Sequence, residues 1–284
     1  MNGKLLRRLI GASIQRSLAP ALHEAEGRYH GLRIHYQLID LEAGRGAEAL
    51  PTLVDAIRVM RFAGVNVTHP CKQAVVPLLD ALSDEARTIG AVNTVVREGE
   101  RLVGHNTDAS GWAWGFRRAL PGADLSCVAL LGAGGAGAAC AHAVAGLGAE
   151  EIRILDRDAG RAGRLMQGLK KRLPSLKTKA EDRIEEALHG ASGLIHATPT
   201  GMANHPGMAL PAALLRPDMW VSEVVYVPLE TPLLRAARAA GCRTMDGGEM
   251  NIGQAVDAFR LFTGREPDAA RMAAHFRSLV EARP

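Results

Sequence analysis

Residues 127–156 run CVALLGAGGAGAACAHAVAGLGAEEIRILD, and this stretch decides the fold. An apolar segment, CVALLG, is followed at once by a cluster of glycines and then by a helical run of small residues. A second apolar segment, EIRIL, ends at Asp156. A strand, a tight turn, a helix and a second strand in this order form a βαβ unit, which builds a parallel sheet.

The glycine cluster GAGGAG fits the pattern G-x-G-x-x-G with Gly132, Gly134 and Gly137. The first glycine permits the tight turn, the second lets backbone N–H groups approach a pyrophosphate, and the third allows the helix to pack closely on the strand. The positive end of the helix then stabilises the phosphate charge. We therefore expect a Rossmann-type dinucleotide site, with Gly135 and Ala136 completing the loop.

The end of the second strand bears on the choice of dinucleotide. A carboxylate at Asp156 accepts hydrogen bonds from ribose hydroxyls and repels a 2′-phosphate, which favours NAD. Arg157 and Arg161 point the other way, because guanidinium groups bind phosphate. Arg157 could instead stack on the adenine. We expect NAD as the cofactor, with NADP as the open alternative.

Composition narrows the class of protein. The chain has 284 residues, enough for about two domains, with 47% hydrophobic and 23% charged residues. Its net charge is only +4 and aromatic residues make up 4%, which argues against a nucleic-acid-binding protein. The four cysteines show no C-x-x-C spacing, so we expect neither a disulfide scaffold nor a metal site. This cysteine usage suits a reducing cytoplasm, where we expect the protein. No apolar stretch is long enough for a membrane helix.

The rest of the chain alternates between strand and helix patterns, with a hairpin around Gly99 and a helix opening near Pro20. We expect strands at 34–41, 65–70, 193–198 and 220–226, helices at 48–64 and 252–282, a helical segment bent or delimited by Pro77 at 73–82, and a charged helix end and loop at 169–183.

Several polar residues follow strand patterns in the first third of the chain. Lys72 is either a proton donor or a solvated surface lysine, and Asp108 is either a functional carboxylate or a helix N-cap. Asn93 could cap, turn or bind a ligand, and Ser17 could cap the helix near Pro20. The residue types alone leave these alternatives open.

The chain resembles the shikimate/quinate dehydrogenase family over nearly its full length. Eight segments carry the resemblance in family order: GASIQRSLAPALHEA, GVNVTHPCKQAVVPLLD, IGAVNTVV, GHNTDASGW, GAGGAG, HATPTGM, VVYVPLETPLL and DGGEMNIGQAVDAF. The resemblance implies an α/β fold with three parts. These are a substrate-binding catalytic domain at 1–108, a Rossmann NAD(P)-binding domain at 109–245, and a C-terminal helical segment at 246–284 that returns to the first domain.

The resemblance also implies roles for individual residues. In the motif NVTxPxK the lysine is catalytic, which is Lys72 here, and the aspartate of the NTD motif, Asp108, pairs with it. The positions that match substrate contacts are Ser17, Thr68, Asn93, Tyr226 and Gln254. The implied reaction is hydride transfer between NAD(P) and the ring hydroxyl of shikimate or quinate, with Lys72 as the acid/base and no metal. The partners implied are a small hydroxy acid and no nucleic acid or membrane, in a monomer or homodimer.

Three positions modify this expectation. Asp156 resembles the NAD-using quinate/shikimate branch, whereas the NADP-using biosynthetic enzymes tend to carry Asn-Arg-Thr there. Ala19 replaces a Ser or Thr that normally helps to hold the substrate carboxylate, a loss of about 1–3 kcal/mol unless Arg16 compensates. Cys71 stands where the family often has an aromatic residue, and we interpret it as a small buried filler. Two alternatives remain: an NADP-dependent dehydrogenase of a related cyclic hydroxy acid, and a non-catalytic sensor of ligand and dinucleotide.

Overall fold

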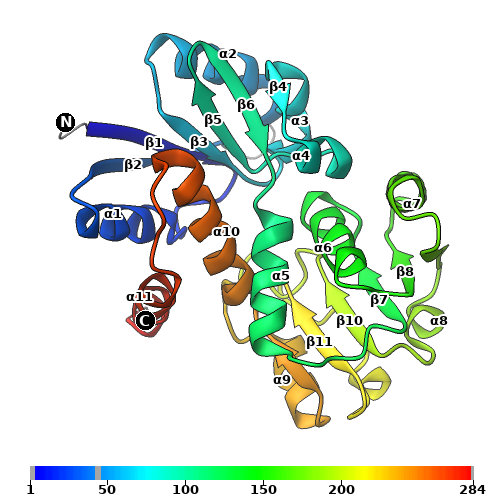
Figure 1. Ribbon diagram of the computed structural model, residues 1–284. Helices are drawn as coiled ribbons and strands as arrows, with labels where there is room; N and C mark the ends of the chain where they lie inside the picture. The colour runs from blue at the N-terminus through cyan, green and yellow to red at the C-terminus, as the bar shows by residue number, and fades with distance from the viewer. Residues whose placement is uncertain (1–3, 42–45, 283–284) are drawn as a thin grey trace. The chain divides into compact units, whose positions relative to one another are not determined.

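The structure, a computed structural model, describes residues 4–41 and 46–282 (Figure 1). The chain divides into two compact units. The first comprises Met1–Thr107 with Gln254–Pro284, and the second comprises Asp108–Gly253. Among the described residues each unit holds one six-stranded sheet. Strands and helices alternate along the chain, so the predicted α/β class is confirmed.

The second unit has an all-parallel sheet in the order β12-β11-β10-β7-β8-β9. Strands β7, β10 and β11 are buried along their whole length, as expected of a parallel sheet with both faces covered. The elements are α5 Asp108–Ala119, β7 Val128–Leu131, α6 Gly135–Gly146, β8 Glu151–Leu155, α7 Ala159–Arg172, β9 Lys177–Ala180, α8 Ile184–Leu188, β10 Gly193–His196, η2 Ala212–Leu214, β11 Trp220–Glu223, α9 Pro232–Ala239 and β12 Arg243–Met245.

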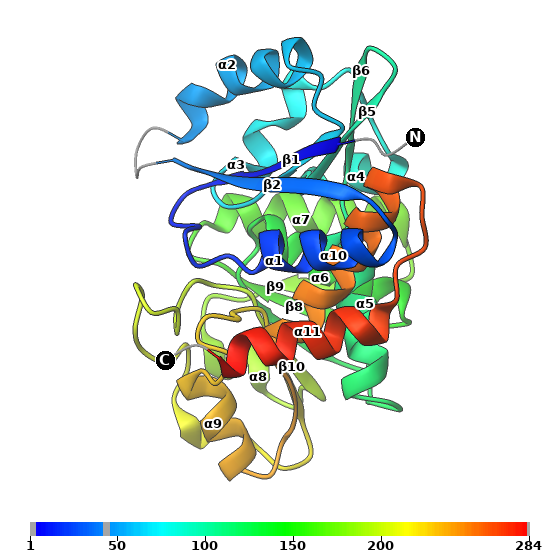
Figure 2. The ribbon, with the colours of Figure 1, turned by 90° about the vertical axis from the view of Figure 1, so that its left-hand side faces the viewer.

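The first unit has a mixed sheet in the order β2-β1-β3-β5-β6-β4, in which β5 runs antiparallel to both of its neighbours. Helices α1 and α2 lie on opposite sides of β1 and β2 (Figure 2). The elements are β1 Lys4–Gly11, α1 Ala19–Tyr29, β2 Arg33–Asp40, α2 Gly46–Val59, β3 Gly64–Val67, α3 Cys71–Ala74, η1 Val76–Leu78, β4 Ala81–Leu82, α4 Asp84–Ile89, β5 Thr94–Glu98, β6 Arg101–His105 and α11 Ala269–Glu281; α10, Gly247–Thr263, begins in the second unit and ends in this one.

Two arginines attach the C-terminal helices to the first unit. The Arg7 Nη2 group on β1 donates to the carbonyl oxygen of Phe262 at 2.6 Å, near the end of α10, where free carbonyls favour a cation. The Arg271 guanidinium on α11 donates to both carboxylate oxygens of Glu26 on α1, at 2.6 and 2.8 Å. Arg271 also lies 4.2 Å from the ring centre of Tyr29. The returning helices are thus held by charged groups as well as by apolar packing.

The helix predicted at 48–64 was too long. Helix α2 ends at Val59, and the chain leaves it through Arg61, which adopts a left-handed φ of 52°. Gly64 is therefore not the C-cap but the first residue of β3. A Cβ atom at Gly64 would lie 2.5 Å from the carbonyl oxygen of Val95 on the neighbouring strand. Sheet packing, rather than helix termination, requires the glycine there.

Three other boundaries also differ from the predictions. The segment 169–183, predicted as helix end and loop, contains the edge strand β9, whose alternating lysines left no apolar signal. The predicted helix at 252–282 is two helices separated near Gly264, where φ is 65°. The segment 73–82 is helical only in part, because Pro77 lies in the 3-10 turn Val76–Leu78, which is followed by β4.

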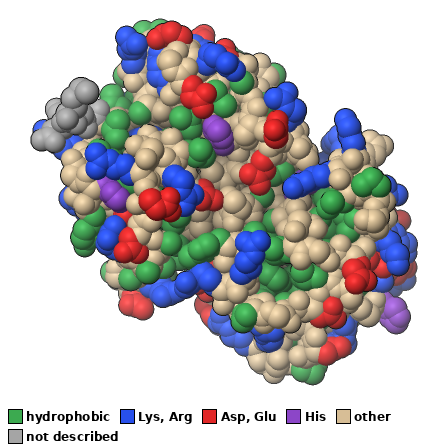
Figure 3. Space-filling model, in the orientation of Figure 1, with side chains coloured by type: hydrophobic (Ala, Val, Ile, Leu, Met, Phe, Trp, Pro, Cys, Tyr) green, Lys and Arg blue, Asp and Glu red, His purple; other side chains and the backbone are tan. Residues whose placement is uncertain are grey.

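Basic and acidic side chains are interspersed on the face shown in Figure 3, in keeping with the small net charge of +4.

Among the helices of residues 4–41 and 46–282, none is both long and apolar enough to cross a membrane.

The glycine turn of the second unit allows an unusually close backbone approach. Gly132 has a φ of 94°, in the left-handed region that favours glycine. A Cβ atom at Gly137 would overlap the carbonyl oxygen of Gly132, so no side chain fits at Gly137. By contrast, a Cβ atom at Gly134 or at Gly146 would meet nothing within 4 Å. The structure therefore explains the first and third glycines of the motif by sterics.

Substitution of Gly137 tests this packing. We expect Gly137→Ala to lower the free energy of unfolding by about 1–3 kcal/mol, because the added methyl group forces α6 away from the turn. The matched control is Gly146→Ala at the other end of the same helix, where alanine should stabilise by up to about 1 kcal/mol. Urea unfolding of both variants measures the difference. Equal stabilities for the two variants would contradict the steric account.

A buried histidine in the first unit makes stability depend on pH. His23 on α1 is 1% exposed and stacks on Tyr36 with ring centres 5.1 Å apart. Burial, reinforced by the positive charge of Arg7, lowers the pKa of His23 to about 3. The unfolded chain therefore binds a proton below about pH 6.5 that the folded chain does not bind until about pH 3.

We expect His23 alone to reduce the free energy of unfolding by about 2 kcal/mol between pH 7 and pH 5. His23→Phe keeps an aromatic ring stacked on Tyr36 and should remove this part of the pH-dependent decrease in the free energy of unfolding. The control is His35→Phe, because His35 is exposed on β2 and should leave the wild-type pH dependence in place. Urea unfolding at the two pH values provides the measurement. A His23→Phe protein that loses as much stability as the wild type would contradict the prediction.

Candidate active site

Lys72 lies five residues after the end of strand β3. It is the second residue of the short helix α3, and it is half-buried. Its carbonyl oxygen accepts a hydrogen bond from the N–H group of Val92 at 2.8 Å. Val92 directly precedes Asn93, another residue of the predicted site. The lysine backbone is therefore fixed beside the segment that carries Asn93.

Asn93 is 3% exposed and has its side-chain amide engaged at both ends. Its Oδ1 atom accepts from the N–H group of Thr107 at 2.8 Å, and its Nδ2 group donates to the Thr107 hydroxyl at 2.9 Å. Thr107 immediately precedes Asp108, which begins helix α5 and is 4% exposed. In this structure Asn93 thus orients the backbone that leads to Asp108.

Asn66 belongs to the same polar network and was missed by the sequence analysis. It lies in β3 at 6% exposure, where its Oδ1 atom accepts from the Tyr36 hydroxyl at 2.8 Å. Its Nδ2 group donates to the carbonyl oxygen of Asn93 at 3.2 Å and to the Thr94 hydroxyl at 3.0 Å. The available signal was an asparagine inside the otherwise apolar strand GVNV, since a buried amide requires partners.

Thr68 and Ser17 follow two strands that are paired in parallel, β3 and β1. The N–H group of Thr68 donates to the Ile10 carbonyl oxygen at 2.9 Å, and the Thr68 side chain is half-buried. The Ser17 hydroxyl accepts from the N–H group of Ala19 at 3.2 Å, just where α1 begins. The structure assigns the N-cap position itself to Leu18, without a side-chain cap.

The two departures noted in the sequence both have apolar surroundings. Ala19 packs against the cluster formed by Leu9, Ile14 and Tyr36. Cys71 is fully buried in the core of the first unit, and burial raises the pKa of its thiol. A buried thiol that stays protonated is a poor nucleophile, which supports the interpretation of Cys71 as a filler.

The glycine loop joins β7 to α6, and Gly134 is the N-cap of the helix without a side-chain cap. Gly135 and Ala136 form the first turn and are half-buried. At such a helix start the backbone N–H groups and the helix dipole favour an anion. The loop residues therefore fit a bound pyrophosphate, and the space beside Gly134 is open, since a Cβ atom there would meet nothing within 4 Å.

Asp156 supports this loop from the end of β8. Its Oδ2 atom accepts from the N–H group of Ala133 at 2.6 Å, and its Oδ1 atom accepts from that of Asp158 at 2.8 Å. Arg157 is exposed, and Arg161 lies 3.4 Å from the Asp158 carboxylate. Two carboxylates and two guanidinium groups thus gather at this strand end.

The remaining predicted residues are divided between the units. Gln254 lies on α10 and belongs to the first unit, whereas Tyr226 follows β11 in the second; both are half-buried. The first unit brings Lys72, Thr68 and Asn93 to neighbouring strand ends. The second unit brings Asp156 to the glycine loop. No cluster of three or more potential metal ligands occurs among the residues that the structure describes.

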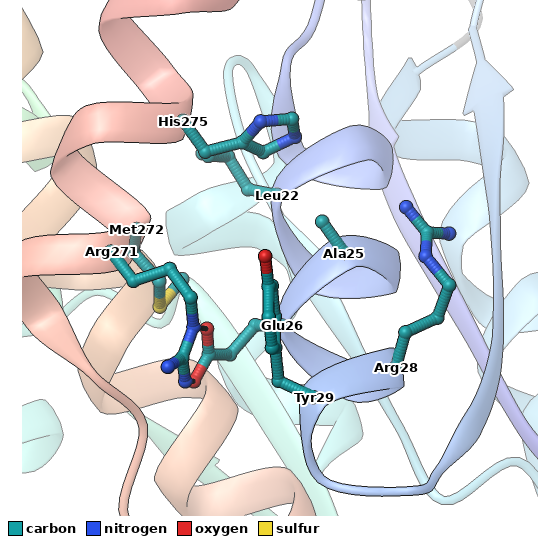
Figure 4. Close-up of a pocket in the computed structure, with 8 residues that line it drawn as sticks. All are labelled: Leu22, Ala25, Glu26, Arg28, Tyr29, Arg271, Met272 and His275. Carbon is teal, nitrogen blue, oxygen red and sulfur yellow. Dashed lines mark hydrogen bonds and ion pairs between the residues drawn. The ribbon is translucent and has the colours of Figure 1, made fainter.

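A pocket of about 370 Å³ lies between α1 and α11, within the first unit (Figure 4). Arg271, Glu26 and Tyr29 stand side by side in it, held by the ion pair and the ring contact described above. Its lining consists of Leu22, Ala25, Glu26, Arg28, Tyr29, Arg271, Met272 and His275. None of the residues predicted to bind substrate or cofactor lines this pocket.

Comparison with known proteins identifies the family. Residues 9–95 match the family model described as the shikimate dehydrogenase substrate binding domain. The chain is 55% identical over 275 residues to the shikimate dehydrogenase (NADP⁺) of Streptomyces avermitilis, covering 96% of this chain and 94% of that protein. It is 47% identical over 279 residues to the quinate/shikimate dehydrogenase (NAD⁺) of Corynebacterium efficiens, covering 97% and 98%.

Solved structures agree with these relatives. The quinate dehydrogenase of Corynebacterium glutamicum in complex with NAD matches at a TM-score of 0.89 and 45% identity, covering 97% of this chain and all of that one. The shikimate 5-dehydrogenase of Thermus thermophilus in complex with NADP(H) and shikimate matches at 0.84 and 35%, covering 97% and 99%. The resemblance inferred from eight segments is confirmed along the full chain, which belongs to the shikimate/quinate dehydrogenase family of oxidoreductases.

Proposed function

We propose that this protein transfers a hydride between NAD and the ring carbon that carries a hydroxyl group in shikimate or quinate. The observation that carries the proposal is the full-length similarity to enzymes named for these two acids, over both the substrate unit and the glycine-loop unit. We further propose that it acts in the cytoplasm as a monomer or homodimer. The four cysteines are free and buried, which is typical of a reducing compartment.

The proposed acid/base residue is Lys72, with Asp108 as its partner. The dinucleotide, when bound, supplies the hydride acceptor or donor. In the oxidation direction Lys72 Nζ takes the proton of the substrate hydroxyl, and in reduction it returns that proton to the same oxygen. The backbone bond from Val92 fixes Lys72, and the Asn93–Thr107 bonds fix the residue before Asp108. The proposed substrate contacts are Ser17, Thr68, Asn93, Tyr226 and Gln254.

The residues of the β8 strand end support NAD rather than NADP. Asp156 directly follows β8, and a carboxylate at the end of this strand repels a 2′-phosphate. Arg161 is paired with Asp158 at 3.4 Å, which leaves the exposed Arg157 as the opposing cation. The second candidate is an NADP-dependent enzyme, favoured by the name of the Streptomyces avermitilis relative at 55% identity.

Replacement of the proposed base separates an enzyme from a ligand sensor. We expect Lys72→Met to lower kcat by about 10²–10⁴-fold, because a methionine side chain cannot accept the proton of the substrate hydroxyl. The dissociation constant for NADH, measured by fluorescence titration, should remain unchanged. Lys170→Met is the control, since Lys170 is exposed on α7 and should retain full turnover. Wild-type turnover in Lys72→Met would contradict the assignment.

The choice of cofactor and acid is tested by initial rates at 340 nm. Shikimate and quinate are each supplied with NAD⁺ and with NADP⁺. We expect kcat/KM to be higher with NAD⁺, because Asp156 disfavours the 2′-phosphate. A higher value with NADP⁺ would establish the second candidate instead. Absence of turnover in all four combinations would overturn the proposed substrates.

A further inference from the structure

A buried histidine–glutamate pair lies beside the glycine loop, within the second unit. His196 and Glu223 are the last residues of β10 and β11 and are register partners in the parallel sheet. Both side chains are 0% exposed. His196 Nδ1 lies 2.9 and 3.0 Å from the two carboxylate oxygens of Glu223. None of the residues assigned to catalysis or ligand binding above belongs to this pair.

The carboxylate of Glu223 is held by several further donors. Its Oε1 atom accepts from the N–H groups of Val224 and Val225 at 2.8 and 2.9 Å. Its Oε2 atom accepts from the hydroxyl of Thr231 at 3.1 Å, and Thr231 in turn caps helix α9. A buried carboxyl group needs hydrogen-bond partners, and these donors supply them. The N–H group of Val224 also donates to the carbonyl oxygen of His196 at 3.0 Å, so β10 and the Glu223 carboxylate together hold the segment that leads to Tyr226.

The opposite side of the imidazole ring contacts Thr198. His196 Nε2 lies 2.5 Å from the Thr198 hydroxyl, which also accepts from the N–H group of Thr200 at 3.3 Å. With Nδ1–H donating to the carboxylate, Nε2 is left to accept a hydrogen bond from the Thr198 hydroxyl. This assignment of the tautomer follows from the hydrogen-bond partners. The pair therefore fixes the rotamer of Thr198.

The methyl group of Thr198 faces the glycine turn. A Cβ atom at Gly132 would lie 3.0 Å from Thr198 Cγ2 and 2.8 Å from the carbonyl oxygen of Ala197. The side chain of Thr198 is thus packed between the ring of His196 and the first glycine of the loop. A chain of contacts runs from Glu223 through His196 and Thr198 to the turn that would cradle the pyrophosphate.

We propose that His196 is a positioning residue, which sets the shape of the glycine loop by holding the Thr198 side chain in one orientation. Replacing a buried ionisable pair with well-packed apolar residues of similar volume is often neutral or stabilising. A role in shaping the glycine loop therefore explains the His196–Glu223 pair better than a contribution to stability does. The inference rests on the proposed function, because it concerns the affinity for the dinucleotide.

Two Thr→Val substitutions on opposite sides of the pair test this inference. Thr198→Val removes the hydroxyl that bonds His196 and should raise the dissociation constant for NADH roughly 3- to 10-fold, the equivalent of one hydrogen bond. Thr198→Ser keeps the hydroxyl and should restore tight binding. Thr231→Val removes a hydroxyl from the other side of Glu223; it should lower the melting temperature and leave the affinity for NADH unchanged. A merely structural network would instead give similar stability losses and unchanged affinities in both valine variants, which would overturn the inference.

Substitution of the histidine itself shows whether Thr198 acts alone. His196→Asn keeps a donor near Glu223 and loses the contact with Thr198, so it should weaken NADH binding as much as Thr198→Val does. The double variant should be no weaker than either single variant, because both remove the same contact. Unchanged binding in His196→Asn would overturn the role of His196. Failure of the wild-type protein to bind NADH or NADPH would overturn the proposed function as well, whereas tight wild-type binding with unaffected variants would overturn this inference alone.

Discussion

The approach of Gly137 to the carbonyl oxygen of Gly132 is the constraint on which the second unit depends. It lets α6 begin directly after β7, so that the uncapped start of the helix and the end of the strand meet at one turn. Two side chains hold this turn from different strands. Asp156 bonds the N–H group of Ala133, and Thr198 packs its methyl group against the turn. The loop thus owes its shape to sterics at two glycines and to contacts from β8 and β10.

The first unit relies on buried amides instead. Asn66 and Asn93 connect the ends of β3 and β5 with the chain that leads to Asp108. Because each amide is both donor and acceptor, one side chain fixes two backbone segments in a single orientation. Lys72, attached by its own carbonyl oxygen to Val92, lies on a framework made rigid in this way. A flexible lysine side chain is thereby carried by a well-defined backbone.

Local patterns in the sequence predicted those turns and hairpins that are formed by residues close together in the chain. The glycine spacing and the hairpin at Gly99 were both predictable from a few adjacent residues. The roles of Lys72 and its partners came from the resemblance and stay proposals. The strand predicted at 220–226 ends earlier, at Glu223, whose own carboxylate accepts from the N–H groups of Val224 and Val225. Asn66 and His196 were missed because their partners Tyr36 and Glu223 lie on other strands, far away in the sequence.

Isotope transfer tests the central claim, hydride transfer from a ring carbon, most directly. Shikimate or quinate carrying deuterium on the ring carbon whose hydroxyl group is oxidised is incubated with NAD⁺, and the reduced cofactor is analysed by mass spectrometry. The account predicts that each molecule of NADH formed carries one deuterium, since the hydride passes from carbon to nicotinamide without exchange with water. NADH without the label, or release of the label into solvent, would contradict it.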